Sequence, residues 1–228
     1  MADRRQLTLD LPFRPAFGRE DFFVADCNRE ALAFLDLWPN WPTPMAFLCG
    51  PTGCGKSHLA AVWQKQSGSA VQDQVKFSEA ISLVDNDRRH FVVEFENAVA
   101  DEQSLFHFYN RVAEVNGSIL ATATIAPARW NISLPDLASR LRTAPVLNIG
   151  MPDDALLEAV LIKLFSDRQL RVEPDVVGYL LKRMDRSLGA ARKLVELLDD
   201  MALAQHRTIS VPFARKILEA GLSQNESP

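Results

Sequence analysis

Residues 45–60 read MAFLCGPTGCGKSHLA, the segment that is most informative about the fold of this chain. Five apolar residues come first, as is typical of a strand that is buried on both faces of a sheet. GPTGCGKS at 50–57 follows and fits G-x-x-x-x-G-K-[ST] at every fixed position. The next residues favour a helix over about 56–66. A strand, a glycine loop and a helix in this order predict a P-loop nucleotide-binding fold.

The loop has the residue types that phosphate binding requires. Glycines at 50, 53 and 55 allow backbone amides to curl around phosphates without side-chain clashes. Lys56 is expected to reach the β and γ phosphates, and Ser57 to offer a hydroxyl to Mg²⁺. The predicted nucleotide contacts here are Gly50, Pro51, Thr52, Gly53, Cys54, Gly55, Lys56, Ser57 and His58. Packing is the alternative for His58, and for Cys54 the sequence leaves open a reactive thiol or a small filler residue.

The rest of the chain extends this pattern. Apolar runs predict further strands near 70–77, at 91–95, 118–124 and 144–150, and helices are expected at 28–37 and about 102–115. Asn28 is a candidate N-cap. From Pro152 only helices are expected, at 153–168, 174–184, 187–205 and 211–220. The fold class is therefore α/β, with a five-stranded parallel sheet flanked by helices and a C-terminal all-helical subdomain. The expected divisions are a tail at 1–20, a core at 21–150, a lid at 151–221 and a disordered end at 222–228.

Composition narrows the class of protein. The 228 residues carry a formal net charge of -4 and no long basic run, which disfavours strong direct DNA binding. No apolar run reaches the roughly 20 residues that a membrane helix needs, and the N-terminus lacks the features of a secretory signal. Cys27, Cys49 and Cys54 show neither zinc spacing nor an even count. A cytoplasmic protein is expected.

A second acidic motif is weaker than the phosphate loop. The run FVVEF at 91–95 is followed by Glu96, a candidate for holding Mg²⁺ through water and for a catalytic role. Glu94 lies one strand period earlier. A strand-end carboxylate that is solvated or paired is the alternative for both. Asn97 stands where a second acid would activate water, and because an amide cannot accept a proton, weak intrinsic hydrolysis is expected.

Three later segments add a family resemblance. They are SILATATIAPARW at 118–130, LPDLASRL at 134–141 and MDRSLGAARKLVELLD at 184–199. In this order they resemble the AAA+ domain of the DnaA family of bacterial replication initiators, over roughly residues 20–220. The resemblance is nearest to truncated homologues that end after the helical lid and lack the DNA-binding domain.

The resemblance implies roles for several residues. Arg140 in LPDLASRL would be an arginine finger that points into a neighbouring protomer's nucleotide, with a surface salt bridge as the alternative and Arg142 as a substitute. Arg186 would sense the bound ADP or ATP from the lid. Phe23 and Val24 would lie against adenine, although aromatic residues there also suit a core. Thr124 falls where the family often has an aspartate, which again argues against robust ATP turnover.

QLTLDLP at 6–12 resembles the short peptide by which bacterial proteins bind the DNA polymerase sliding clamp, the beta subunit. Gln6, Leu7, Leu9 and Leu11 would be its anchors, and packing of these leucines on the chain's own core is the alternative. Together these features predict a regulator of replication initiation that binds adenine nucleotide, the clamp and DnaA, and that can form homo-oligomers. A self-contained ATPase such as a helicase loader, or a nucleotide-stabilised scaffold, are the alternative functions.

Overall fold

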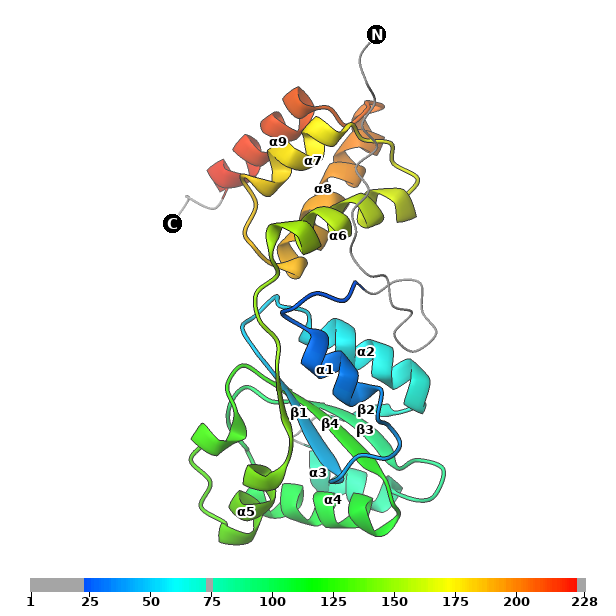
Figure 1. The fold of residues 1–228 in the computed structure, drawn as a ribbon, viewed down its shortest axis with the longest axis vertical. Helices are drawn as coiled ribbons and strands as arrows, with labels where there is room; N and C mark the ends of the chain where they lie inside the picture. Colours follow the sequence, from blue (N-terminus) through cyan, green and yellow to red (C-terminus); the bar gives the residue numbers. More distant parts are fainter. Residues whose placement is uncertain (1–22, 73–75, 225–228) are drawn as a thin grey trace. The chain divides into compact units, whose positions relative to one another are not determined.

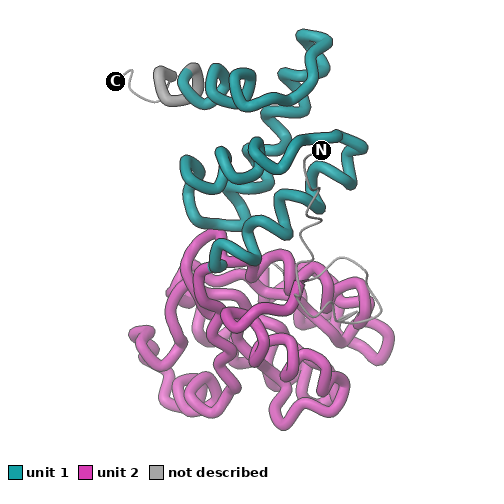
Figure 2. The backbone as a smooth tube through the Cα atoms, turned by 45° about the horizontal axis from the view of Figure 1, so that its top comes forward, with its two compact units in different colours: residues 1–13, 152–228 teal, residues 14–151 magenta. Residues whose placement is uncertain are grey.

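The computed structural model describes residues 23–72 and 76–224 (Figure 1). The predicted anchors Gln6, Leu7, Leu9 and Leu11 lie outside these residues. The described chain divides into two compact units, with the boundary between Met151 and Pro152 (Figure 2). The first is called the α/β unit and the second the helical unit. No helix in the described ranges combines the length and apolar character needed to span a membrane.

The α/β unit is built around a five-stranded parallel sheet in the order β2-β3-β4-β1-β5. The strands are β1 (Met45–Cys49), β2 (Ala70–Gln72), β3 (His90–Glu94), β4 (Ser118–Ala123) and β5 (Val146–Asn148). The helices are α1 (Arg29–Leu35), α2 (Lys56–Ser67), α3 (Phe77–Ala80), α4 (Glu102–Glu114) and α5 (Pro135–Thr143), with 3-10 turns η2 (Ile81–Leu83) and η3 (Pro127–Arg129). This arrangement confirms the predicted fold class.

Alternation along β1 explains the two helical layers. Met45, Phe47 and Cys49 pack into one hydrophobic cluster with residues of α3, α4 and α5, whereas Ala46 and Leu48 pack into another with α1 and α2. Successive side chains of a strand point to opposite faces, so a strand that is apolar throughout must be covered on both sides. Figure 1 shows α1 and α2 on one face of the sheet and α3, α4 and α5 on the other.

The helical unit contains α6 (Asp154–Asp167), α7 (Pro174–Leu181), α8 (Leu188–Gln205) and α9 (Val211–Gln224). Its own core includes Leu161, Phe165, Leu180, Val195 and Phe213. Two helix starts are capped by side chains: Asp153 accepts from Leu156 N at 2.8 Å and Ser187 from Ala190 N at 3.0 Å.

Several predicted boundaries are wrong. The second strand ends at Gln72, and Phe77 begins α3 instead of ending a strand, because its side chain packs in the core beneath α4. The first helix ends at Leu35. Asn28 sits at the N-cap position of α1 but makes no capping bond. Its amide instead accepts from Ala25 N at 3.0 Å and donates to Phe23 O at 3.1 Å, which holds the preceding segment.

Candidate functional site

The phosphate loop has a backbone that only glycine accommodates at three points. Gly53 and Gly55 have φ of 79° and 113°, in the region that favours glycine. At Gly50 the reason is space, because a Cβ there would lie 2.3 Å from the carbonyl oxygen of Ile149. The loop therefore lies directly against the segment that leaves β5.

The helix α2 begins at the phosphate loop, and no capping side chain accepts a hydrogen bond from its first backbone N–H groups. Gly55 is the N-cap residue and has no side chain that could accept from the first-turn N–H groups. Lys56 begins the helix, and its Nζ donates to Gly50 O at 2.7 Å and to Pro51 O at 3.0 Å. A positive charge beside a helix N-terminus is the arrangement that binds phosphate groups.

The residues that could hold Mg²⁺ are few and polar. Ser57 is exposed in the first turn of α2, and Glu96 is exposed after β3. Within the described ranges, no group of three or more His, Cys, Asp or Glu side chains could hold a metal ion by itself. Mg²⁺ suits such a site when nucleotide is present, because it binds through one or two protein oxygens and the phosphates.

The two thiols near the loop are buried rather than activated. Burial raises the pKa of Cys49 to about 11, against the opposing charge of Lys56. Burial also raises the pKa of Cys54, and Lys56 and backbone hydrogen bonds oppose that shift. Cys54 packs with Leu59 and Leu48. The structure thus favours the filler interpretation of Cys54 over a thiol with a lowered pKa.

The segment expected to contact adenine lies beside the same loop. Val24 is buried in the cluster that includes Cys54 and Ile149, and Phe23 is half-buried. The carbonyl of Cys27 accepts from Gly150 N at 2.9 Å. Residues 149–150 therefore connect the segment at 23–28 with Gly50. His58 is half-buried on α2.

The ends of β3 and β4 are joined by Asn97. The strand β3 ends at Glu94, so Glu96 and Asn97 lie in the loop after it, not in the strand. Asn97 has a φ of 66°, and its Oδ1 accepts from Thr124 N at 3.0 Å and from Ile125 N at 2.8 Å. The amide oxygen at this position therefore binds two main-chain groups of the β4 loop. Asn97 is a link between two strand ends, a role that its place in the acidic motif did not reveal.

Arg140 lies on α5 against the aromatic face of α4. Its Cζ is 5.1 Å from the centroid of the Phe106 ring and 5.0 Å from that of Tyr109. Over the described part of the chain, no hydrogen bond or ion pair engages its guanidinium group, which is against the salt-bridge interpretation. Arg142, by contrast, donates from Nε to Ala138 O at 3.1 Å and is exposed.

Glu102 is a residue that the sequence analysis missed. Its Oε1 accepts from Ser133 N at 2.9 Å and its Oε2 from Leu134 N at 2.6 Å, immediately before α5 begins. The one local feature that draws attention to Glu102 is its place in the first turn of a helix, where an acid interacts favourably with the helix dipole. That feature does not indicate hydrogen bonds to residues 31 and 32 positions away.

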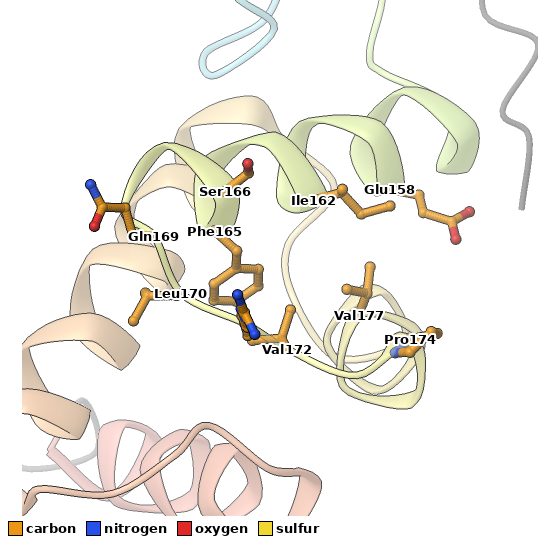
Figure 3. Close-up of a pocket in the computed structure, with 10 residues that line it drawn as sticks. Glu158, Ile162, Phe165, Ser166, Gln169, Leu170, Val172, Pro174 and Val177 are labelled. Carbon is orange, nitrogen blue, oxygen red and sulfur yellow. The ribbon is translucent and has the colours of Figure 1, made fainter. Parts of the chain in front are cut away.

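The helical unit contains Arg186 and a separate pocket. Arg186 is exposed and pairs with Asp154 of the first turn of α6. The pocket has a volume of about 920 Å³ and lies between α6, the loop after it and α7 (Figure 3). Figure 3 shows Phe165 directed from α6 toward Val172. None of the residues predicted to bind nucleotide lines this pocket.

Comparison with known proteins identifies the fold and the family that the lid matches. Residues 154–218 match the family model described as Hda, lid domain. Domain III of the replication initiation protein DnaA from Thermotoga maritima is similar at 17% identity, with a TM-score of 0.76 over 92% of this chain and 98% of that one. The chain has a DnaA-like AAA+ fold with an Hda-like lid. The resemblance inferred from the sequence is confirmed at this level.

Two further structures show how widely this fold is shared. AMPPCP-bound DnaA from Aquifex aeolicus has a TM-score of 0.64 at 16% identity, covering 82% of this chain and 66% of that one. The RuvB Holliday junction branch migration motor of Thermotoga maritima has a TM-score of 0.63 at 16% identity, covering 83% and 66%. The same fold thus occurs in a DnaA protein and in a branch migration motor.

Proposed function

We propose that this chain regulates replication initiation by promoting hydrolysis of ATP bound to DnaA, while itself binding adenine nucleotide and the sliding clamp. The match of residues 154–218 to the Hda lid carries this choice, because the AAA+ core by itself suits initiators and motors equally. DnaA is the proposed partner because this chain has the fold of its domain III, and an arginine finger can be supplied in trans by a second protein.

Adenine nucleotide, as ADP or ATP with Mg²⁺, is the ligand of the phosphate loop. Gly53 and Gly55 allow the positive-φ backbone of the loop, Gly50 allows its close approach to Ile149 O, and Lys56 supplies the charge. Ser57, with Glu96 through water, would hold the metal ion. Val24 and Phe23 would lie along the base, and Arg186 would contact the phosphates from the lid after leaving Asp154. Lys56→Ala should lower nucleotide affinity markedly in calorimetry, since one charge and its phosphate contacts are lost.

Weak turnover by the chain alone is part of the proposal. Asn97 carries no basic group, and both lone pairs of its oxygen are directed at main-chain amides of the β4 loop. Thr124 adds no acid. Neither Asn97 nor Thr124 could therefore take a proton from water beside the γ-phosphate.

Arg140 would act in trans. An arginine finger contributes about 10³–10⁵ in rate in the best-studied systems, because it stabilises charge that develops in the transition state. Because no hydrogen-bond partner of its guanidinium is found among residues 23–72 and 76–224, Arg140 keeps its donors for a neighbour's phosphate. The peptide at 6–12 would bring the chain to the DNA-loaded clamp, and with it to DnaA.

A single-turnover assay tests the central step. DnaA preloaded with labelled ATP is mixed with clamp, DNA and either wild type or Arg140→Ala. Wild type should accelerate hydrolysis and Arg140→Ala should not, while nucleotide and clamp binding persist. Arg140→Lys should rescue poorly, since an ammonium lacks the planar fork. Arg142→Ala is the matched control and should behave as wild type. Equal acceleration by wild type and Arg140→Ala would exclude the mechanism.

The clamp step has its own test. Gln6→Ala combined with Leu7→Ala should abolish capture of the chain by immobilised clamp and leave the thermal midpoint nearly unchanged. Persistent capture would show that another surface binds the clamp. A midpoint several degrees lower would instead show that these residues pack on the core.

A self-contained ATPase is the second candidate, and the likeness to the RuvB motor is the observation in its favour. It requires substantial phosphate release by the purified chain without DnaA or clamp. A steady-state measurement on the chain alone separates the two functions.

A further inference from the structure

The helix α4 presents one stripe of side chains to α5. Glu102, Phe106 and Tyr109 are spaced i, i+4 and i+7, which places them on the same side of a helix. Glu102 binds the backbone at Ser133 and Leu134, and the two rings lie beneath Arg140. The helices α4 and α5 lie in contact (Figure 1). Hydrogen bonds accepted by Glu102 join them at the start of α5, and ring contacts join them further along it.

The ring contacts restrain Arg140 without using its donors. A guanidinium beside aromatic rings is attracted by the negative charge on the ring faces, and this attraction needs no N–H group. A free arginine side chain loses considerable rotamer entropy when it is fixed in one geometry, so a side chain that is already restrained loses less on binding. Arg142, two residues further, illustrates the alternative, since its Nε is already bonded to Ala138 O.

We propose that Phe106 and Tyr109 are positioning residues, which hold the Arg140 guanidinium in the orientation in which it meets a partner's nucleotide. The inference rests on the proposed function and goes beyond it, because it identifies what makes this arginine effective. Glu102 supports the same geometry by fixing where α5 begins. The rings are not catalytic residues, since they act only through Arg140.

Substitution of Phe106, the half-buried ring, tests the positioning role most directly. Phe106→Leu keeps an apolar side chain and removes the π system, and Phe106→Trp restores an aromatic face. In the single-turnover assay with DnaA, clamp and DNA, the concentration of this protein is varied up to saturation. Phe106→Leu should lower the maximal rate about 2- to 5-fold, the range expected for one cation–π contact. The concentration for half-maximal effect should stay the same, and Phe106→Trp should recover the rate.

Tyr109 supplies matched variants at the second ring. Tyr109→Phe keeps the ring and should leave the maximal rate unchanged, and Tyr109→Leu should lower it about as much as Phe106→Leu. Tyr109 is 6% exposed and belongs to the core, so tryptophan fluorescence must first establish that each variant folds. If Tyr109→Leu is unfolded, the two Phe106 variants decide the question.

The outcomes separate this inference from the proposed function. If Arg140→Ala removes acceleration but Phe106→Leu retains the full maximal rate, the positioning role is wrong and the proposed function stands. A rise in the half-maximal concentration with an unchanged maximal rate also overturns the role, because the ring then contributes to docking. If Arg140→Ala itself has no effect, the proposed function fails, and this inference fails with it.

Discussion

Replacing Glu102 by alanine should lower the free energy of unfolding of the α/β unit by about 2 kcal/mol. The carboxylate accepts two main-chain hydrogen bonds, from Leu134 N at 2.6 Å in a partly buried place and from Ser133 N at 2.9 Å in an exposed one. A hydrogen bond to a charged group contributes about 1.5–3 kcal/mol when buried. We assign about 1.5 kcal/mol to the partly buried bond and about 0.5 kcal/mol to the exposed one, because water replaces the exposed bond more readily.

The assay can be confined to the unit that contains the substitution. The chain has four tryptophans, at 38, 41, 63 and 130, and all of them lie in the α/β unit. Tryptophan fluorescence during urea unfolding therefore reports this unit, and the helical unit does not contribute to the signal. The expected change is a lower midpoint at an unchanged slope, which is the signature of a stability change and not of an altered unfolded state.

Glu114→Ala is the matched control on the same helix. Glu114 pairs with Arg111 at 3.2 Å, and the two side chains are 63% and 42% exposed. Such a surface pair contributes under about 1 kcal/mol, and an acid near a helix C-terminus opposes the helix dipole. Glu114→Ala should therefore change the free energy of unfolding by less than about 0.5 kcal/mol. Equal effects of the two substitutions would refute the idea that Glu102 fixes the start of α5.

Substitutions at four single positions test further parts of the structure. Gly178→Ala should stabilise the helical unit by about 0.5–1 kcal/mol in a thermal melt followed by circular dichroism, because its Cβ meets nothing within 4 Å and alanine favours a helix interior. Gly50→Ala should lower nucleotide affinity in calorimetry, because its Cβ would collide with Ile149 O. Retained affinity in Gly50→Ala would contradict this close approach. Asn97→Asp keeps one oxygen for both main-chain bonds and adds a second oxygen that can accept a proton, so it should raise phosphate release by the chain alone. Unchanged slow release by Asn97→Asp would contradict the explanation of weak turnover by a missing base. Asn97→Ala should destabilise the α/β unit by about 1–2 kcal/mol. Burial, together with a neighbouring arginine, lowers the pKa of His90 below its ordinary 6.5. The unfolded chain therefore takes up the proton first as pH falls, and the free energy of unfolding should decrease below about pH 6.5. His90→Phe should reduce this pH dependence in urea titrations at pH 5 to 8.

The surroundings of Arg140 show which features could be predicted from the local sequence and which could not. The segment LPDLASRL, which carries the family resemblance, contributes all its residues but the first to α5. Its hydrophobic residues Leu137 and Leu141 are buried, as their spacing of four requires for one helix face. The rings beneath Arg140 come from α4, some thirty residues earlier in the chain, and no spacing rule connects the two helices.

Elements that depend on neighbours along the chain could be predicted from the sequence. The strand, loop and helix at 45–67 follow from apolar residues, glycines and helix-favouring residues in order, and the lid helices follow from their own periodicity. Local backbone preferences and burial periodicity act over a few residues, so a short stretch of sequence is enough to predict the element it forms.

Contacts that join distant segments could not be predicted in this way and depend on how the whole unit packs. Asn97 reaches Thr124 across 27 positions, Glu102 reaches Leu134 across 32, and Phe77 enters the core as part of a helix because α4 covers it. Each contact depends on which strands become neighbours in the sheet and where the following loops are brought together. That arrangement is a property of the whole packed unit, since the free energy of burying both sheet faces is shared among all its elements and is not encoded at any one position.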